Sequence, residues 1–164
     1  MTATPQTTAR PDMMLIFRLS GEAFAIPVGC VHEILDPIPM APVPNAPAFA
    51  PALVNVRGTI APLIDIRQRL RMPAATPGPA ARLIVLELPV LGTSTRLAIL
   101  GDAVEEVIEV DLAALEPVPD LGARWPEQYV QGIARHGDGL VILLNPQTLF
   151  QPDTLSGADR SAVA

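Results

Sequence analysis

The chain has 164 residues, about one domain, and 49% of them are hydrophobic, so it can bury a substantial core. Its formal net charge is −6, and its 11 basic residues are all arginine and form no basic run, which argues against nucleic acid and anionic membrane surfaces as partners. The single cysteine, Cys30, excludes an intrachain disulfide framework and a cysteine-based zinc site.

The first half of the chain reads as short strands. The 19 prolines of the whole chain disfavour long helices. Residues 1–12 are polar without periodicity, so we expect a disordered tail there. Strands are predicted at 15–19, 23–28, 31–34, 53–57 and 59–64, with a helical turn at 66–70. The proline-rich segment 36–51 is predicted to be an ordered loop, and its P-x-x-P spacings leave a polyproline ligand as the alternative.

The second half repeats this order after a loop or linker at 73–81. Strands are predicted at 82–88, 95–100, 104–110, 129–135 and 140–144, followed by a helical turn at 146–150 and a flexible tail at 151–164. A shift of 73 residues places Val31-His32-Glu33-Ile34 on Val104-Glu105-Glu106-Val107, and a shift of 80 places Leu63-Ile64-Asp65 on Leu143-Leu144-Asn145.

This weak repeat predicts two small β units of about 70 residues each, which would be marginal alone and should pack on each other. Closure of each unit into a barrel would hide the strand edges. We therefore expect one all-β domain over 13–150, with one barrel at about 13–72 and the other at about 82–150. The apolar runs reach only five or six residues, far fewer than the roughly 20 of a spanning helix, so we expect a soluble, cytoplasmic protein.

The sequence offers no set of residues typical of catalysis. His32 and His136 are interpreted as surface residues and Cys30 as a small buried or half-buried one. The acidic group between Asp102 and Asp111 is interpreted as a solvated strand face rather than a calcium loop. Nucleotide-binding and hydrolase motifs do not occur. We therefore expect no enzyme activity, no metal and no cofactor.

Four further residues leave two interpretations open. Glu33 and Arg57 are charged residues among apolar neighbours, so they either pair with each other or lie exposed at strand ends. Trp125 and Tyr129 are the only tryptophan and tyrosine, and they either pack internally or anchor an interface.

The segment 42–70 carries a long string in which Asn55, Arg57, Gly58, Pro62 and Asp65 read N-x-R-G-x-x-x-P-x-x-D. With Pro44-Asn45, Pro47 and Phe49 before it and Arg67 after it, this string resembles the CheW family, adaptors that couple chemoreceptors to the histidine kinase CheA. The resemblance covers about residues 14–150, with further matches at 24–28, 31–34, 97–107, 132–133 and 141–144. Ala52 departs from the family's usual glycine, which would strain the backbone if a positive φ is needed there, and Gly101 replaces a common valine.

The resemblance implies two packed five-stranded SH3-like β-barrels without an active site, in a cytoplasmic, stand-alone adaptor that reaches membrane receptor arrays only through its partners. One barrel would bind the CheA regulatory domain, and a groove near the barrel junction would bind the cytoplasmic tip of a chemoreceptor. The implied receptor-side residues are Val31, Glu33, Ala52, Arg57, Val104 and Val107. The kinase-side candidates are Pro44, Asn45, Pro47, Thr59 and Ile60. The structural motif residues are Asn55, Gly58, Pro62, Asp65 and Asp102.

The resemblance also implies that Glu33 and Arg57 form a pair of charges. Two alternatives to the chemotaxis adaptor remain at this point. One is a related scaffold of a pilus or surface-sensing array, and the other is a β-barrel module that binds a peptide or small ligand.

Overall fold

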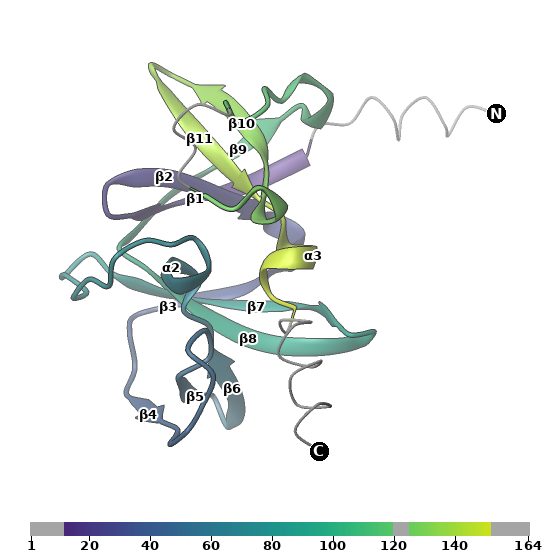
Figure 1. The fold of residues 1–164 in the computed structure, drawn as a ribbon. Helices are drawn as coiled ribbons and strands as arrows, with labels where there is room; N and C mark the ends of the chain where they lie inside the picture. The colour runs from purple at the N-terminus through teal and green to yellow at the C-terminus, as the bar shows by residue number, and fades with distance from the viewer. Residues whose placement is uncertain (1–11, 120–124, 152–164) are drawn as a thin grey trace.

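A computed structural model describes residues 12–119 and 125–151 of the chain. They form two β-sheets joined by short helical turns, and Figure 1 shows one sheet above the other with α2 and α3 at the junction. The prediction of an all-β fold of two packed β units is confirmed. Apart from residues 12 and 151, the predicted tails lie outside the described residues, and Asp12 already belongs to the first strand.

The first sheet has the strand order β10-β11-β2-β1-β9, and the second has the order β3-β7-β8-β6-β5-β4. The first comprises β1 (Asp12–Leu19), β2 (Glu22–Pro27), β9 (Ala103–Val110), β10 (Val130–His136) and β11 (Gly139–Leu144). The second comprises β3 (Val31–Leu35), β4 (Met40–Pro42), β5 (Ala52–Val56), β6 (Thr59–Leu63), β7 (Arg82–Val90) and β8 (Thr93–Gly101). The helical turns are η1 (Val28–Cys30), α2 (Ile66–Arg69), η2 (Leu112–Ala114), η3 (Glu127–Tyr129) and α3 (Pro146–Leu149).

Each sheet takes strands from both halves of the chain. The third strand of each half pairs antiparallel with the first strand of the other half, as β9 with β1 and β3 with β7. The closing hairpins also cross over, because β11 runs parallel to β2 and β6 runs parallel to β8. The predicted division into a barrel at 13–72 and another at 82–150 is therefore wrong, although the two halves do follow the same order of elements. Burial patterns within a strand do not say which sheet it joins, because pairing is a long-range choice.

The second sheet contains a sixth strand that the sequence did not predict. β4 lies in the proline-rich segment and pairs only with β5, at the edge of the sheet, where proline is tolerated. Six flat strands would hold the two edges about 24 Å apart, since neighbours are about 4.8 Å apart. The five residue steps from Leu35 to Met40 span at most about 17 Å. The sheet must therefore curl, which brings its edge strands toward each other.

Three apolar clusters explain why so many strands are apolar on both faces. On β1, Leu15 and Phe17 pack into the core between the two sheets, whereas Met14 and Ile16 pack inside the curl of the first sheet. A third cluster, which includes Val54, fills the curl of the second sheet. Strands buried on both faces read as continuous apolar runs rather than as alternating ones.

The helical turns α2 and α3 begin in the same way, as the repeat predicts. The Asp65 side chain accepts a hydrogen bond from the backbone N–H of Gln68, and Asn145 caps α3 through Gln147. The N–H of Asp65 donates to the carbonyl of Phe49 at 2.7 Å, and the N–H of Asn145 donates to that of Tyr129 at 2.9 Å. In the part of the chain that the structure describes, no helix has the length and apolar character to cross a membrane.

Candidate functional site

Glu33 and Arg57 form an ion pair across the curl of the second sheet. Nε of Arg57 donates to Oε1 of Glu33 at 3.0 Å. Glu33 lies on edge strand β3 and Arg57 in the turn between β5 and β6, so the contact joins segments from opposite sides of the sheet. The Glu33 side chain is half-buried, whereas that of Arg57 is 73% exposed. The predicted pairing is confirmed, and the guanidinium also remains accessible from solvent.

The turn that carries Arg57 is strained at that residue. Arg57 has φ +51° and Gly58 has φ +90°, the pair of positive values found in two-residue hairpin turns. Glycine or asparagine is the usual first residue in such turns, and a left-handed arginine costs about 1–2 kcal/mol. Asn55 stabilises the turn through its Oδ1 atom, which accepts from the Gly58 N–H at 2.9 Å. Strain of this kind often marks a side chain retained for function.

Of the other residues assigned to the receptor side, three valines fall on edge strands of the two sheets and Ala52 falls on an inner strand. Val31 on β3 and Val104 on β9 are half-buried and pack against the same core cluster, and Val107 on β9 is 46% exposed. Ala52 is buried on β5 and pairs with Leu63. Its backbone is not among the positive-φ positions, so alanine introduces no conformational strain there. The concern raised by the missing glycine is therefore wrong for the backbone.

The kinase-side candidates separate into two groups. Ile60, at the start of β6, is 60% exposed and lines a shallow apolar hollow with Met40 on β4 and Leu53 on β5. Thr59 precedes it at the hairpin turn and is exposed. Pro44, Asn45 and Pro47 are also exposed, but they lie in the loop between β4 and β5 and do not line this hollow.

Sequence reasoning missed Met40 and Leu53 as neighbours of Ile60. Leu53 carried a signal that could have been used, because it lies in phase with polar Asn55 on the outward face of β5. An apolar residue at an outward position of an amphipathic strand indicates a surface that has a partner or a use.

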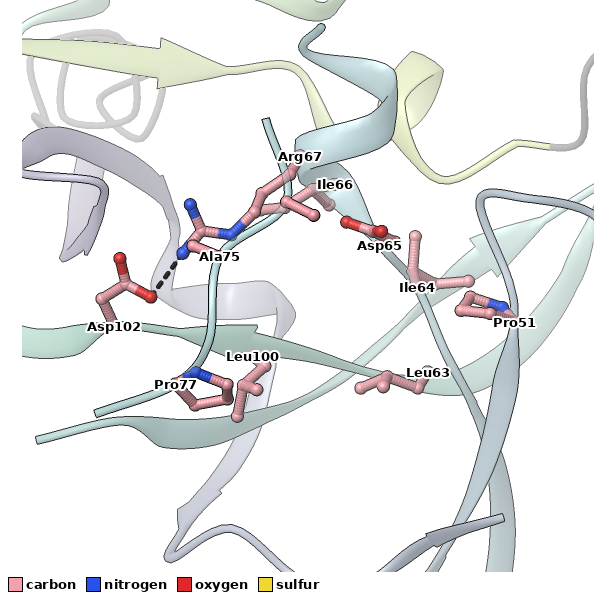
Figure 2. A pocket seen from close by; sticks show the side chains of 11 residues that line it. Pro51, Leu63, Ile64, Asp65, Ile66, Arg67, Ala75, Pro77, Leu100 and Asp102 are labelled. Carbon is pink, nitrogen blue, oxygen red and sulfur yellow. Dashed lines mark hydrogen bonds and ion pairs between the residues drawn. The ribbon is translucent and has the colours of Figure 1, made fainter. Parts of the chain in front are cut away.

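A second polar cluster lies where the two sheets meet. Arg67 on α2 is buried and forms an ion pair with Asp102, as the dashed line in Figure 2 marks. Its Nη1 also donates to Oγ of Ser20 at 2.6 Å. Burial acts to raise the pKa of Asp102, but the hydrogen bonds from Arg67 and from the Ser20 N–H outweigh it and hold that pKa below its usual value.

The Arg67–Asp102 pair lies at one end of an open cleft of about 190 Å³. Apolar side chains form most of its lining, among them Leu63 of β6, Ile66 of α2 and Leu100 of β8. Residues of the 73–81 segment close one side, where Ala75 and Pro77 are visible in Figure 2. Asp102 therefore differs from the rest of the predicted acidic face. Glu105, Glu106 and Glu109 on β9 are exposed as expected, whereas Asp102 is a structural link.

Arg69 on α2 joins this helical turn to α3. Its guanidinium carbon lies 4.0 Å from the centre of the Phe49 ring and 5.5 Å from that of Tyr129, two residues related by the repeat. Nη1 donates to the carbonyl of Leu149 at 3.2 Å, and Nη2 has no hydrogen-bond partner among the described residues. Tyr129 therefore packs internally, as does Trp125, whose ring meets Phe24 edge to face.

The remaining reactive side chains do not converge on a catalytic arrangement in the described residues. His32 lies 3.6 Å from Glu87 and His136 lies 2.9 Å from Glu106, both at exposed positions on different sheets. Burial raises the pKa of the Cys30 thiol. Residues 12–119 and 125–151 contain no group of three or more His, Cys, Asp and Glu side chains placed to hold a metal ion.

The two curled β-sheets expose their edge strands and an apolar hollow. These features are typical of a protein that binds other proteins. Residues 13–153 match the family model described as the CheW-like domain. The chain therefore belongs to the CheW family, a family of chemotaxis scaffold and adaptor proteins.

Several relatives match over nearly their full length. The chain is 26% identical over 145 residues to the chemotaxis protein CheW of Rhizobium meliloti (strain 1021), covering 88% of this chain and 91% of that protein. It is 27% identical over 146 residues to the protein FrzA of Myxococcus xanthus, covering 87% and 88% of the two chains. The crystal structure of the scaffolding protein TtCheW from Thermoanaerobacter tengcongensis aligns with a TM-score of 0.74 at 29% identity, covering 87% of this chain and 90% of that chain.

Proposed function

We propose that this chain couples chemoreceptors to the histidine kinase CheA, by contacting the cytoplasmic tip of the receptor and the regulatory domain of the kinase. The observation that carries the proposal is the Glu33–Arg57 pair, which holds an exposed arginine in a strained turn against the edge strand β3. Membership of the CheW family and relatives named chemotaxis protein CheW support it. In this proposal the protein acts in the cytoplasm and reaches the membrane only through the receptor.

The receptor surface in this proposal combines Arg57 with the edge strands β3 and β9. Val31, Val104 and Val107 offer apolar contacts of moderate size, which suit a reversible interface. Nε of Arg57 is occupied by Glu33, so the rest of the guanidinium is presented in a fixed orientation to acceptors on the receptor. Ala52 is buried beneath this surface and acts only through the packing of β5.

The kinase surface in this proposal is the hollow formed by Met40, Leu53 and Ile60, flanked by Thr59. Its lining is mainly apolar, and its aliphatic side chains are exposed without a covering segment among the described residues. Pro44, Asn45 and Pro47 form a rigid loop beside β4, and we assign them an outer part of the same contact. The adaptor would then transmit receptor state by geometry, since the two contacts share one small rigid body.

A binding experiment with three variants tests both surfaces. Arg57→Ala should weaken binding to a cognate receptor cytoplasmic fragment about tenfold and leave binding to the kinase regulatory domain unchanged. Ile60→Ser should produce the reverse pattern. Leu91→Ser serves as the control, because Leu91 is an exposed aliphatic residue away from both surfaces. Affinities are measured by isothermal titration calorimetry.

Two results would contradict the proposal. If the wild-type chain binds neither the receptor fragment nor the kinase domain, a ligand-binding module becomes the better description. If Arg57→Ala and Leu91→Ser behave alike toward the receptor fragment, Arg57 does not belong to the receptor surface.

A further inference from the structure

Three residues from distant parts of the chain form what we call the α2 corner: Ser20, Arg67 and Asp102. The Arg67 guanidinium reaches both of the others. Its Nη1 donates to Ser20 Oγ at 2.6 Å, and its Nη2 contacts the Asp102 carboxylate, as Figure 2 shows for the second contact. The third side of the triangle is also bonded, because Oδ2 of Asp102 accepts from the Ser20 N–H at 2.7 Å. The corner is thus a closed network in which Arg67 is 9% exposed.

This network lies at the point where the chain crosses between the sheets. Asp102 is the single residue between β8 of the second sheet and β9 of the first, and Ser20 lies in the turn between β1 and β2. The Asp102 N–H donates to the carbonyl of Arg18 at 2.8 Å. The backbone of Asp102 therefore fixes the start of β9 to the first sheet, and the Asp102 carboxylate fixes it to α2.

α2 also follows β6 after only Ile64 and Asp65, so Arg67 is close in sequence to the hollow that contains Ile60. On the other side of the corner, β9 carries Val104 and Val107. One buried guanidinium thus connects β9, which is proposed to meet the receptor, with the β5–β6 hairpin, which carries the proposed kinase hollow and, at its turn, Arg57. Energetic coupling between two sites can be carried by hydrogen-bond and ion-pair networks of this kind.

The repeat supplies an internal comparison, which we call the α3 corner: Leu91, Gln147 and Gln151. Gln147 corresponds to Arg67, and Leu91-Gly92 forms the same positive-φ turn as Ser20-Gly21. Here the turn is held by neutral contacts only, since the Leu91 N–H donates to Oε1 of Gln151 at 3.0 Å. The repeat therefore does not require an ion pair at this place, and the charged network is specific to the corner that precedes β9.

We propose that Arg67 is a positioning residue that fixes the angle of β9 relative to the β5–β6 hairpin, and that receptor control of the kinase depends on it. This inference rests on the proposed function for its second half only. Its first half concerns the chain alone. Arg67 contacts neither partner in this proposal, so its loss should impair coupling rather than the separate affinities.

The structural half is tested by a distance measurement on the full chain. Spin labels are attached to Leu53→Cys on β5 and Glu109→Cys on β9, in a Cys30→Ser background. The distance between the labels is measured by pulsed electron–electron double resonance. Arg67→Gln should broaden or shift the distribution, whereas Gln147→Ala, at the equivalent position of the α3 corner, should leave it unchanged. Ser20→Ala removes one bond of the network and serves if Arg67→Gln does not fold. An unchanged distribution in the α2-corner variant overturns the inference.

The functional half is tested with cognate receptor fragments and kinase. In Arg67→Gln and Ser20→Ala, the change in kinase activity on receptor stimulation should fall about fivefold or more, while each binary affinity is retained. Full receptor control, or a parallel loss of both affinities and control, would overturn the inference. A wild-type chain that binds neither partner contradicts the proposed function instead, and the label distances still decide whether Arg67 positions β9.

Discussion

Glu33 and Glu106 occupy the same place in the repeat, yet they meet different cations. In the second sheet Glu33 accepts from Arg57, which lies in a turn with positive φ. In the first sheet Glu106 lies 2.9 Å from His136, the last residue of β10, and the pair carries full charge only when the imidazole is protonated. Each contact joins strands from opposite sides of a curled sheet.

This difference separates a contact that stabilises the fold from a side chain that is available to bind a partner. Both sheets use a glutamate on an edge strand to meet the opposite hairpin, so this contact belongs to the architecture. Only the second sheet supplies a permanently charged, strained and exposed arginine. The same contrast holds between the α2 corner and the α3 corner, where charge again appears on one side of the repeat only.

The largest effect on stability should come from removing the Arg67–Asp102 ion pair of the α2 corner, which the α3 corner lacks. Arg67→Gln leaves the partly buried Asp102 carboxylate without its cation and should lower the free energy of unfolding by about 1.5–3 kcal/mol. Gln147→Ala is exposed at the matching position and should change it by less than about 0.5 kcal/mol. Urea denaturation of both variants measures this difference, and equal losses would show that the ion pair adds nothing.

A second comparison concerns Ala52 and Gly132, which occupy equivalent positions in the repeat. A Cβ atom added at Gly132 would lie 3.0 Å from Cβ of Leu115 and 3.1 Å from the carbonyl oxygen of Glu116. Gly132→Ala should therefore destabilise by about 1–3 kcal/mol through overpacking. The reverse change, Ala52→Gly, should cost only about 0.5–1 kcal/mol, mainly from backbone entropy. Thermal unfolding followed by circular dichroism ranks the two, and the opposite ranking would contradict the packing at Gly132.

The acid sensitivity of the α2 corner follows from the lowered pKa of Asp102. Because the folded-state pKa lies below the unfolded value of about 3.9, the ionised carboxylate stabilises the fold above that pH. This contribution is lost as the pH falls through the folded-state pKa. Asp102→Asn should flatten the loss of stability below about pH 4, measured by urea denaturation at several pH values. Glu109→Gln makes the same charge change on the exposed face of β9 and should alter that profile less.

The smallest effects should come from the two crossing pairs themselves. Glu33→Gln and Glu106→Gln each remove one contact that is partly open to solvent, and each should cost about 0.2–1 kcal/mol. Only Glu33→Gln should also weaken receptor binding, because it releases Arg57 from its fixed orientation. Differential scanning calorimetry and receptor titration together separate the two roles. Equal effects of both variants on receptor affinity would remove the functional distinction between the pairs.

Local features of this chain were predictable, and long-range ones were not. Strands were predicted at 53–57 and 59–64 with Gly58 between them, and the repeated V-x-E-[IV] pattern predicted two equivalent strands. Two charges among apolar neighbours left the Glu33–Arg57 contact as one of two possibilities, and the family resemblance implied it. These inferences depend on residues close in sequence or on a burial penalty that any fold must satisfy.

The exchange of strands between the halves had no signature in the pattern of residues. β3 and β9 read as half-buried edge strands whichever sheet they join. The network at Ser20, Arg67 and Asp102 was missed for the same reason, since it joins three segments far apart in the chain. β4 was missed because prolines mask a short edge strand that pairs on one side only.

The strand exchange has a consequence for how the molecule is made. β9 must find β1, and β11 must find β2, after more than eighty residues of intervening chain. Such a high contact order favours slow folding, because the entropy of closing long loops is lost before the pairing is gained. During synthesis neither sheet can be completed by the first half alone. Neither half can therefore exist as a folded unit with a complete sheet of its own, because each sheet draws strands from both halves.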